Sequence, residues 1–134
     1  MEPLASLTKR KNSGTTKLNK NSKLFKTIIA AIQEKKGEHI TSLDLRKIPE
    51  AVSDFFIVCE GTSQPQVRAI ADNIEDKVRE ACGEKVFHKE GFQQLHWVLM
   101  DYVNIVVHVM QPETRKFYAL EEMWSDAPLD SHDD

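Results

Sequence analysis

The segment FFIVCE, residues 55–60, is a near-continuous apolar run, and it constrains the fold more than any other part of the chain. A short run without polar alternation is typical of a central β-strand that is buried on both faces of a sheet. Gly61, Thr62 and Ser63 follow directly, and apolar residues at helical spacing come after them. The segment therefore predicts a buried strand, a tight turn and a helix.

The helix after this turn has the clearest periodicity in the chain. Thr62 or Ser63 is its expected N-cap and Gly83 its expected end. Its apolar face consists of Val67, Ile70, Ala71, Ile74, Val78 and Ala81. We expect a first helix over 23–36 after an N-cap at Ser22. We expect a last helix over 112–124 that begins at Pro112 and has the apolar stripe Phe117, Leu120 and Trp124.

Four further segments have the pattern of strands, namely 39–46, 85–88, 96–102 and 105–110. The predicted order is α-β-β-α-β-β-β-α, an α/β fold with a mixed sheet of about five strands and helices packed on it. The 134 residues suffice for one domain, which we place at 23–125. A Lys-, Ser-, Thr- and Asn-rich segment, 1–22, is expected to be a disordered basic tail, and 126–134 a short acidic tail.

Charge is unevenly distributed along the chain. Residues 1–23 hold six basic residues and one acidic residue, so the other 12 basic and 20 acidic residues give a net charge of −8. An acidic body disfavours a broad nucleic-acid surface and favours a basic protein partner, although the same charge would also serve solubility. No apolar run is long enough to span a bilayer, and we expect no secretory signal, because the first residues contain no apolar core. Cys59 and Cys82 match no metal-site or redox spacing, which favours a cytoplasmic setting.

The turn at Gly61, Thr62 and Ser63 has the outline of a phosphate-binding loop at a helix start. It matches neither the Walker loop nor the dinucleotide fingerprint, so a capped strand-to-helix turn is the alternative. A nucleotidyltransferase would also need paired carboxylates on a strand to hold two metal ions. Asp101 lies on a predicted strand, but Val103 stands two residues later. The spacing of the histidines matches no zinc signature, so we expect no metal and no cofactor.

The segment 96–110 is the most informative for binding. If its two strands form a hairpin about Val103 and Asn104, one face is almost wholly apolar and includes Tyr102. The other face mixes large apolar residues with a carboxylate and an imidazole: Trp97, Leu99, Asp101, Val106, His108 and Met110. Such a mixture is typical of a protein interface. The alternative is a second core layer that other helices cover.

These stretches resemble the ribosomal silencing factors, also called the Iojap family. The resemblance rests on DFFIVCEGTSQPQVRAIADNIEDKV, residues 54–78, and WVLMDYVNIVVHVMQPETRKFYALEEMW, residues 97–124, and it covers roughly 24–124. The combination of GTS, WVxxDY, VVHVM and the R-x-F/Y-Y-x-L-E-x-x-W helix is specific to this family. Its members usually carry Gly-Asp where this chain has Val103-Asn104, and segment 1–22 is longer than is usual among them.

The resemblance implies a nucleotidyltransferase-like fold without catalysis. It implies binding to ribosomal protein fourteen of the large subunit, which blocks joining of the small subunit and lowers translation when nutrients are scarce. The implied contact involves the mixed face, so the expected partner-binding residues are Trp97, Leu99, Asp101, Tyr102, His108 and Met110. A homodimer could use the same face, and RNA contact is expected at most from the basic tail. A large-subunit assembly factor and a nucleotidyltransferase using Gly61, Thr62, Ser63 and Asp101 remain the alternatives.

Overall fold

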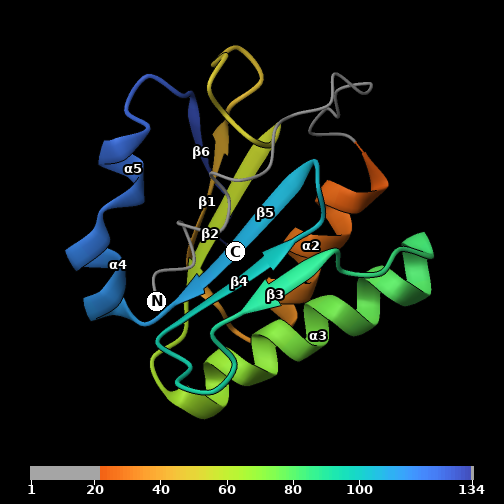
Figure 1. Ribbon diagram of the computed structural model, residues 1–134. Coiled ribbons are helices and arrows are strands. Elements are labelled where there is room, and N and C mark those ends of the chain that lie inside the picture. Colours follow the sequence, from red (N-terminus) through yellow and green to blue (C-terminus); the bar gives the residue numbers. More distant parts are fainter. Residues whose placement is uncertain (1–21, 134) are drawn as a thin grey trace.

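The computed structural model describes residues 22–133, which form one mixed sheet with helices on both faces (Figure 1). The sheet has six strands in the order β3-β4-β5-β2-β1-β6. Strand β2 runs parallel to β5, and every other neighbouring pair is antiparallel. The elements are α2 Lys23–Glu34, β1 Glu38–Asp44, β2 Phe55–Glu60, α3 Gln64–Cys82, β3 His88–Glu90, β4 Trp97–Asp101, β5 Ile105–Met110, α4 Pro112–Tyr118, α5 Leu120–Met123 and β6 Leu129–Ser131. The α/β class and the mixed sheet predicted from the sequence are confirmed.

Strand β2 lies inside the sheet and separates two hydrophobic clusters. Phe55, Ile57 and Cys59 point into the larger cluster, where α2 and α3 cover the sheet. Phe56 and Val58 point into the second cluster, on the side of α4 and α5. Because both faces are covered, the strand has no polar alternation, and the apolar run predicts its position correctly.

The helix ends follow the predicted capping residues. The Ser63 hydroxyl accepts a hydrogen bond from Gln66 N, and Gly83 ends α3 in the left-handed conformation with φ 66°. The Ser22 hydroxyl accepts from Phe25 N and caps α2 in the same way. Helix α2 ends at Glu34, two residues before the predicted end.

Two predicted strands are displaced in sequence. Strand β1 covers 38–44 where the sequence predicts 39–46. Strand β3 covers 88–90 where the sequence predicts 85–88, because only His88, Lys89 and Glu90 pair with β4. All three side chains of β3 are exposed or half-buried, so no apolar periodicity marks this edge strand.

A sixth strand lies in the segment predicted to be an acidic tail, 126–134, and the prediction is wrong for Leu129–Ser131. This strand pairs antiparallel with β1. The residues after it also bond to the body, since the His132 ring lies 2.8 Å from the Ser42 hydroxyl and Asp133 Oδ1 accepts from Ile40 N. These contacts depend on backbone and polar groups, which leave no signal in a hydrophobic pattern.

The last helix is broken where the sequence predicts one helix over 112–124. Ala119 adopts φ 48°, and this left-handed residue ends α4 and begins α5. Phe117 is 79% exposed, so it is wrongly placed in the predicted apolar stripe, whereas Leu120 is buried. Arg115 takes the inward position of α4 instead.

The hairpin of β4 and β5 has the register that the sequence predicts, with Leu99 opposite His108 and Trp97 opposite Met110. Its turn contains a strained residue, because Val103 has φ 73°. A β-branched side chain rarely adopts this region. Asp101 Oδ1 accepts a hydrogen bond from Val103 N at 2.8 Å, and Tyr102 N donates to Ile105 O, so these bonds hold the turn in place.

We therefore predict that Val103→Asn raises the free energy of unfolding by about 1 kcal/mol, since asparagine tolerates the left-handed region that costs other residues about 1–2 kcal/mol. Val103→Ala is the control, because alanine removes the branched side chain without gaining that tolerance. Urea unfolding of both variants measures the effect. Equal stability of the two variants would contradict the assignment of strain to this φ angle.

Candidate binding surface

The face of β4 and β5 that the sequence marks as mixed is a second core layer in this structure. Trp97, Leu99, Val106 and Met110 are buried there. The residues that share this cluster come from other parts of the chain: Leu43, Leu45, Ile48, Ala51, Val52, Phe56, Val58, Tyr118, Leu120, Trp124 and Ala127. The alternative that the pattern left open, a second core, is therefore the arrangement observed.

All six residues predicted to bind a partner are buried. The most exposed is Trp97, at 6%; the others are Leu99, Asp101, Tyr102, His108 and Met110. The expectation that they form an exposed patch is wrong for this structure, because the second cluster covers the apolar members of the face. Tyr102 lies in the larger cluster beneath α2 and α3, as its parity in the hairpin predicts.

The centre of this second layer is a polar pair in an aromatic environment. Trp97 Nε1 donates to His108 Nδ1 at 3.0 Å, and the Phe56 ring lies edge-on to the imidazole with centroids 4.6 Å apart. Since Nδ1 accepts, the proton of neutral His108 lies on Nε2, and this atom has no partner among the described residues. Burial lowers the pKa of His108 from 6.5 to about 3. His108 is therefore a neutral structural residue.

We predict that the buried imidazole makes stability depend on pH. In the unfolded chain His108 gains a proton below about pH 6.5, whereas in the folded chain it stays neutral until the pH approaches about 3. The unfolded state then binds more protons, so stability is lost as the pH falls. At about 1.4 kcal/mol per pH unit, His108 should lower the free energy of unfolding by about 2 kcal/mol between pH 7 and pH 5.

The variant that tests this effect is His108→Gln, because its amide oxygen can still accept from Trp97. Urea unfolding at pH 7 and pH 5 should show that the stability difference between the natural chain and the variant narrows at the lower pH. His88→Gln is the control for the loss of an exposed histidine. A difference that stays constant between the two pH values would rule out a buried neutral His108.

The turn at Gly61, Thr62 and Ser63 is a capped turn in which both hydroxyl groups are already hydrogen-bonded. Gln66 Oε1 accepts from Thr62 N at 2.8 Å and from the Thr62 hydroxyl at 3.0 Å. Together with the Ser63 cap this resembles a capping box. A Cβ on Gly61 would lie 3.0–3.3 Å from Val67, so glycine permits this close approach. Capping and close packing therefore account for the glycine and the two hydroxyl residues of this turn.

The described residues, 22–133, contain no group of three or more His, Cys, Asp or Glu side chains that could hold a metal ion. Burial raises the pKa of the Cys59 thiol to about 12, which disfavours the reactive thiolate, and the residue is the buried small hydrophobe that the sequence predicts. No helix in this range is long and apolar enough to cross a membrane.

The outer side of α4 and α5 exposes large apolar side chains, whereas the mixed face of β4 and β5 is buried. Phe117 is 79% exposed and Met123 55%. The Phe117 ring contacts Tyr118 with centroids 4.9 Å apart, and Tyr118 in turn packs on Trp97 at 4.7 Å. We call the exposed side of α4 and α5, with Phe117 and Met123, the α4–α5 surface. Sequence reasoning missed it because the spacing of Phe117 and Leu120 suggested one inward face on an unbroken helix.

Arg115 attaches α4 to the sheet through its guanidinium group. Nη1 donates to His39 O at 2.6 Å and to Glu60 Oε2 at 3.2 Å. Nη2 donates to the Thr41 hydroxyl, and Nε to Glu121 Oε2. The side chain is only 10% exposed. This network fixes the position of the α4–α5 surface, and its two charged residues on this helix pair belong to the R-x-F/Y-Y-x-L-E-x-x-W pattern.

The family described as "Ribosomal silencing factor during starvation" (RsfS) matches residues 18–134, a range that includes all the elements above. The chain belongs to the ribosomal silencing factor family. A ribosomal silencing factor of Bacillus subtilis is 42% identical over 106 residues, which are 79% of this chain and 88% of that protein. The family predicted from the motifs is thus confirmed.

Members of the family also resemble this chain in structure and beyond the bacteria. A crystal structure of a protein from Chromobacterium violaceum superposes with a TM-score of 0.72 at 35% identity, covering 76% of this chain and 83% of that one. A mouse protein named "Mitochondrial assembly of ribosomal large subunit protein 1" is 32% identical over 84 residues, 61% of this chain and 36% of the mouse protein. Relatives of RsfS thus include one whose name refers to assembly.

Proposed function

We propose that this chain binds the large ribosomal subunit through ribosomal protein fourteen and blocks joining of the small subunit. It would thereby repress translation when nutrients are limited, as a cytoplasmic protein associated with ribosomes. The observation that carries the proposal is the match of residues 18–134 to the family described as silencing ribosomes during starvation. Steric occlusion needs a stable body and one adhesive surface, and it needs no catalytic group.

The α4–α5 surface is the part of the chain that we assign to the partner. Phe117 and Met123 are large, apolar and exposed, which is typical of residues that anchor a protein interface. Trp97 lies directly beneath Tyr118, so we assign a supporting role to the buried residues on its side of the hairpin: Trp97, Leu99, Asp101, His108 and Met110. Tyr102 lies on the opposite face of the sheet and stabilises the larger cluster instead. The acidic body would attract a basic ribosomal protein and speed the encounter at low salt.

A binding role is favoured over the nucleotidyltransferase alternative by the geometry of the turn after β2. The Thr62 and Ser63 hydroxyls bond within the turn and its helix cap. Asp101 is buried and its carboxylate accepts from Val103 N, so it does not face an open site. Titration calorimetry with ATP, CTP and Mg²⁺ tests this directly, and measurable heat of binding would favour the enzyme.

The proposal is tested by co-sedimentation with purified subunits. We expect the natural chain to pellet with large subunits and to keep added small subunits from joining. Phe117→Ala should weaken this binding about 30-fold, because truncating an interface anchor costs about 2 kcal/mol or more. Phe87→Ala is the matched control, since it removes a phenyl group that is 65% exposed at another place.

The outcomes of this experiment distinguish an error in the assigned surface from an error in the proposed function. If the natural chain binds large subunits and both variants bind equally well, the α4–α5 surface is not the contact, although the ribosome remains the partner. Absence of binding by the natural chain would reject the function. The free chain could also pair with itself through this surface, and the large subunit should then dissociate the homodimer.

A role in assembly of the large subunit is the second candidate, and the name of the mouse relative favours it. Both roles need the same contact, so binding alone does not separate them. Depletion of the protein from growing cells distinguishes the two. An assembly factor should leave incomplete large subunits in exponential growth, whereas a silencing factor should leave them complete and raise translation during starvation.

A further inference from the structure

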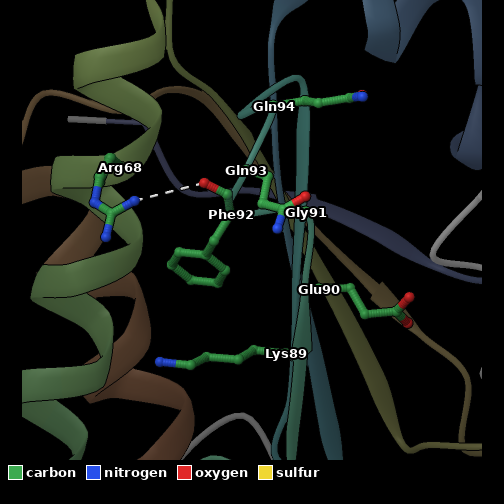
Figure 2. Close-up of a pocket in the computed structure, with 7 residues that line it drawn as sticks. All are labelled: Arg68, Lys89, Glu90, Gly91, Phe92, Gln93 and Gln94. Atoms are coloured by element: carbon green, nitrogen blue, oxygen red, sulfur yellow. Dashed lines mark hydrogen bonds between the residues drawn. The ribbon is translucent and has the colours of Figure 1, made fainter.

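A pocket of about 530 Å³ lies beside α3, the helix that covers the face of the sheet opposite to α4 and α5 (Figures 1 and 2). It is formed between α3 and the loop that joins β3 to β4, and its lining residues are Arg68, Lys89, Glu90, Gly91, Phe92, Gln93 and Gln94. Figure 2 shows Arg68 reaching from α3 toward the Phe92 ring, with Lys89 on the same side and Glu90 pointing away.

The Phe92 ring lies between two cationic side chains, and we call its accessible aromatic surface the platform. Lys89 Nζ lies 5.0 Å from the centroid of its ring, and Arg68 Cζ lies 5.9 Å from it. Phe92 is partly buried against the larger core cluster, so the ring is held in place while part of it stays accessible. Arg68 and Lys89 come from different elements, and both keep about half of their side chains exposed, at 54% and 44%.

Arg68 Nη1 donates to Phe92 O at 3.5 Å, and two further contacts that do not involve the cations fix the loop to the body. Gly91 has φ 89°, and a Cβ there would lie only 2.0 Å from Trp97 O, so glycine permits the loop to lie against β4. Gln94 O accepts from Gln64 Nε2, in the first turn of α3, at 2.8 Å. The platform is therefore ordered before any ligand arrives, which lowers the entropy lost on binding.

The cations carry acidic neighbours that a ligand can replace. Lys89 Nζ lies 2.9 Å from Glu75 Oε1, and Arg68 Nε lies 3.7 Å from Asp72 Oδ2. Ion pairs this exposed contribute little to stability. A phosphate can therefore take the place of a carboxylate at either cation with little loss, and it can also bond to the guanidinium fork.

We propose that this pocket binds an unpaired nucleotide of an RNA strand in the large subunit, with the base stacked on Phe92 and the phosphate held by Arg68 and Lys89. An aromatic face beside cations is the arrangement that proteins use for single-stranded RNA. The inference rests on the proposed function, because a contact of one nucleotide is weak alone and needs a neighbouring protein contact to raise its effective concentration. It also agrees with the acidic body, which disfavours a broad RNA surface.

The test uses the full chain and a labelled, unstructured single-stranded RNA oligonucleotide, followed by fluorescence anisotropy at several salt concentrations. Phe92→Leu keeps an apolar side chain on the core but removes the stacking face, and it should weaken binding about tenfold. A double variant, Arg68→Gln with Lys89→Gln, should reduce the slope of log affinity against log salt by about 0.7, the value for one lost phosphate contact on a single strand. Thermal unfolding checks that each variant is folded.

Two further variants keep the result specific to the pocket. Lys26→Gln with Lys35→Gln removes two exposed charges near α2 and should have less effect than the pocket double variant. Substituting Lys9, Arg10 and Lys11 by Gln measures the contribution of the basic segment 1–22. The inference is overturned if the pocket variants bind like the natural chain, or if the α2 variant loses as much affinity. It is also overturned if a labelled polyglutamate peptide binds as tightly as RNA and depends on Phe92 equally.

Co-sedimentation with large subunits separates this inference from the proposed function. If the natural chain pellets with large subunits but its RNA affinity does not depend on Phe92, the pocket inference alone fails. If the natural chain does not pellet with them, the proposed function fails, and with it the ribosomal source of the RNA. If both hold, Phe92→Leu should lower affinity for the subunit without affecting the contact made by Phe117.

Discussion

Replacing Arg115 with Leu is expected to lower the free energy of unfolding by at least about 3 kcal/mol, the range measured when one partner of a buried ion pair is removed. The guanidinium group is 10% exposed and bonds to acceptors on β1, β2 and α5. Leucine would leave the carboxylates of Glu60 and Glu121 near each other without their shared cation, and both are largely buried. The loss would fall on the attachment of α4 to the sheet.

Two controls define this effect. Arg115→Lys keeps the charge but lacks the planar fork that reaches several acceptors, so it should recover only part of the lost stability. Arg79→Leu removes an exposed pair with Asp76 and should change stability by no more than about 0.5 kcal/mol. Urea unfolding at pH 7 measures all three variants. Equal stability of the Leu variant and the natural chain would mean that the network does not hold the fold.

The parts of the fold that the sequence predicts well are those whose neighbours are nearby in sequence. The apolar run 55–60 needs only itself to indicate burial on both faces, and α3 has its cap, periodicity and terminal Gly83 within one segment. The register of β4 and β5 follows from a short hairpin that leaves few alternatives. Local patterns were sufficient in each case.

The candidate site was predicted less well, because its exposure depends on distant segments. Whether Trp97 and Leu99 are exposed or buried is decided by Tyr118, Trp124 and the segment between β1 and β2, and periodicity within a strand cannot show what covers it. The sequence pattern places Phe117 in the core for a similar reason. A single left-handed residue, Ala119, ends α4 and breaks the continuous helix on which that prediction depends.

The inward position of α4 illustrates the limit of hydrophobic patterns. A pattern that scores Arg115 as polar places it on the solvent side, yet several of its acceptors lie on β1 and β2, more than 50 residues away in sequence. Strand β6 escapes notice in the same way, since its pairing with β1 uses backbone groups and its side chains remain largely exposed. Long-range polar contacts require the fold to be known before they can be seen.

Replacing Trp97 with Ala is expected to lower the free energy of unfolding by about 4 kcal/mol, within the range for truncating a buried aromatic side chain. The indole is 6% exposed and packs on Tyr118 with ring centroids 4.7 Å apart. Its removal would open a cavity in the second core layer. It would also take away the hydrogen bond to His108 Nδ1, leaving a buried imidazole without a partner on either nitrogen among the described residues.

Trp97→Phe separates the two contributions, since it retains an aromatic ring but lacks the N–H donor. It should lose about 1–2 kcal/mol, the cost of leaving a buried acceptor unsatisfied, with a small part from the lost volume. Denaturant unfolding of both variants gives the comparison. If Trp97→Ala proved as stable as the natural chain, the indole could not be a core residue, and the exposed interface expected from the sequence would be restored.

The consequence for function follows from the size of this effect. A folded domain is stable by only about 5–15 kcal/mol, so Trp97→Ala removes a large share of the total, and lost ribosome binding by this variant would not reveal an interface. Phe117→Ala removes a side chain that is 79% exposed and should leave stability nearly unchanged. A loss of binding by the Phe117 variant at unchanged stability would therefore locate the contact, whereas a loss by the Trp97 variant would only report that the support beneath Tyr118 had failed.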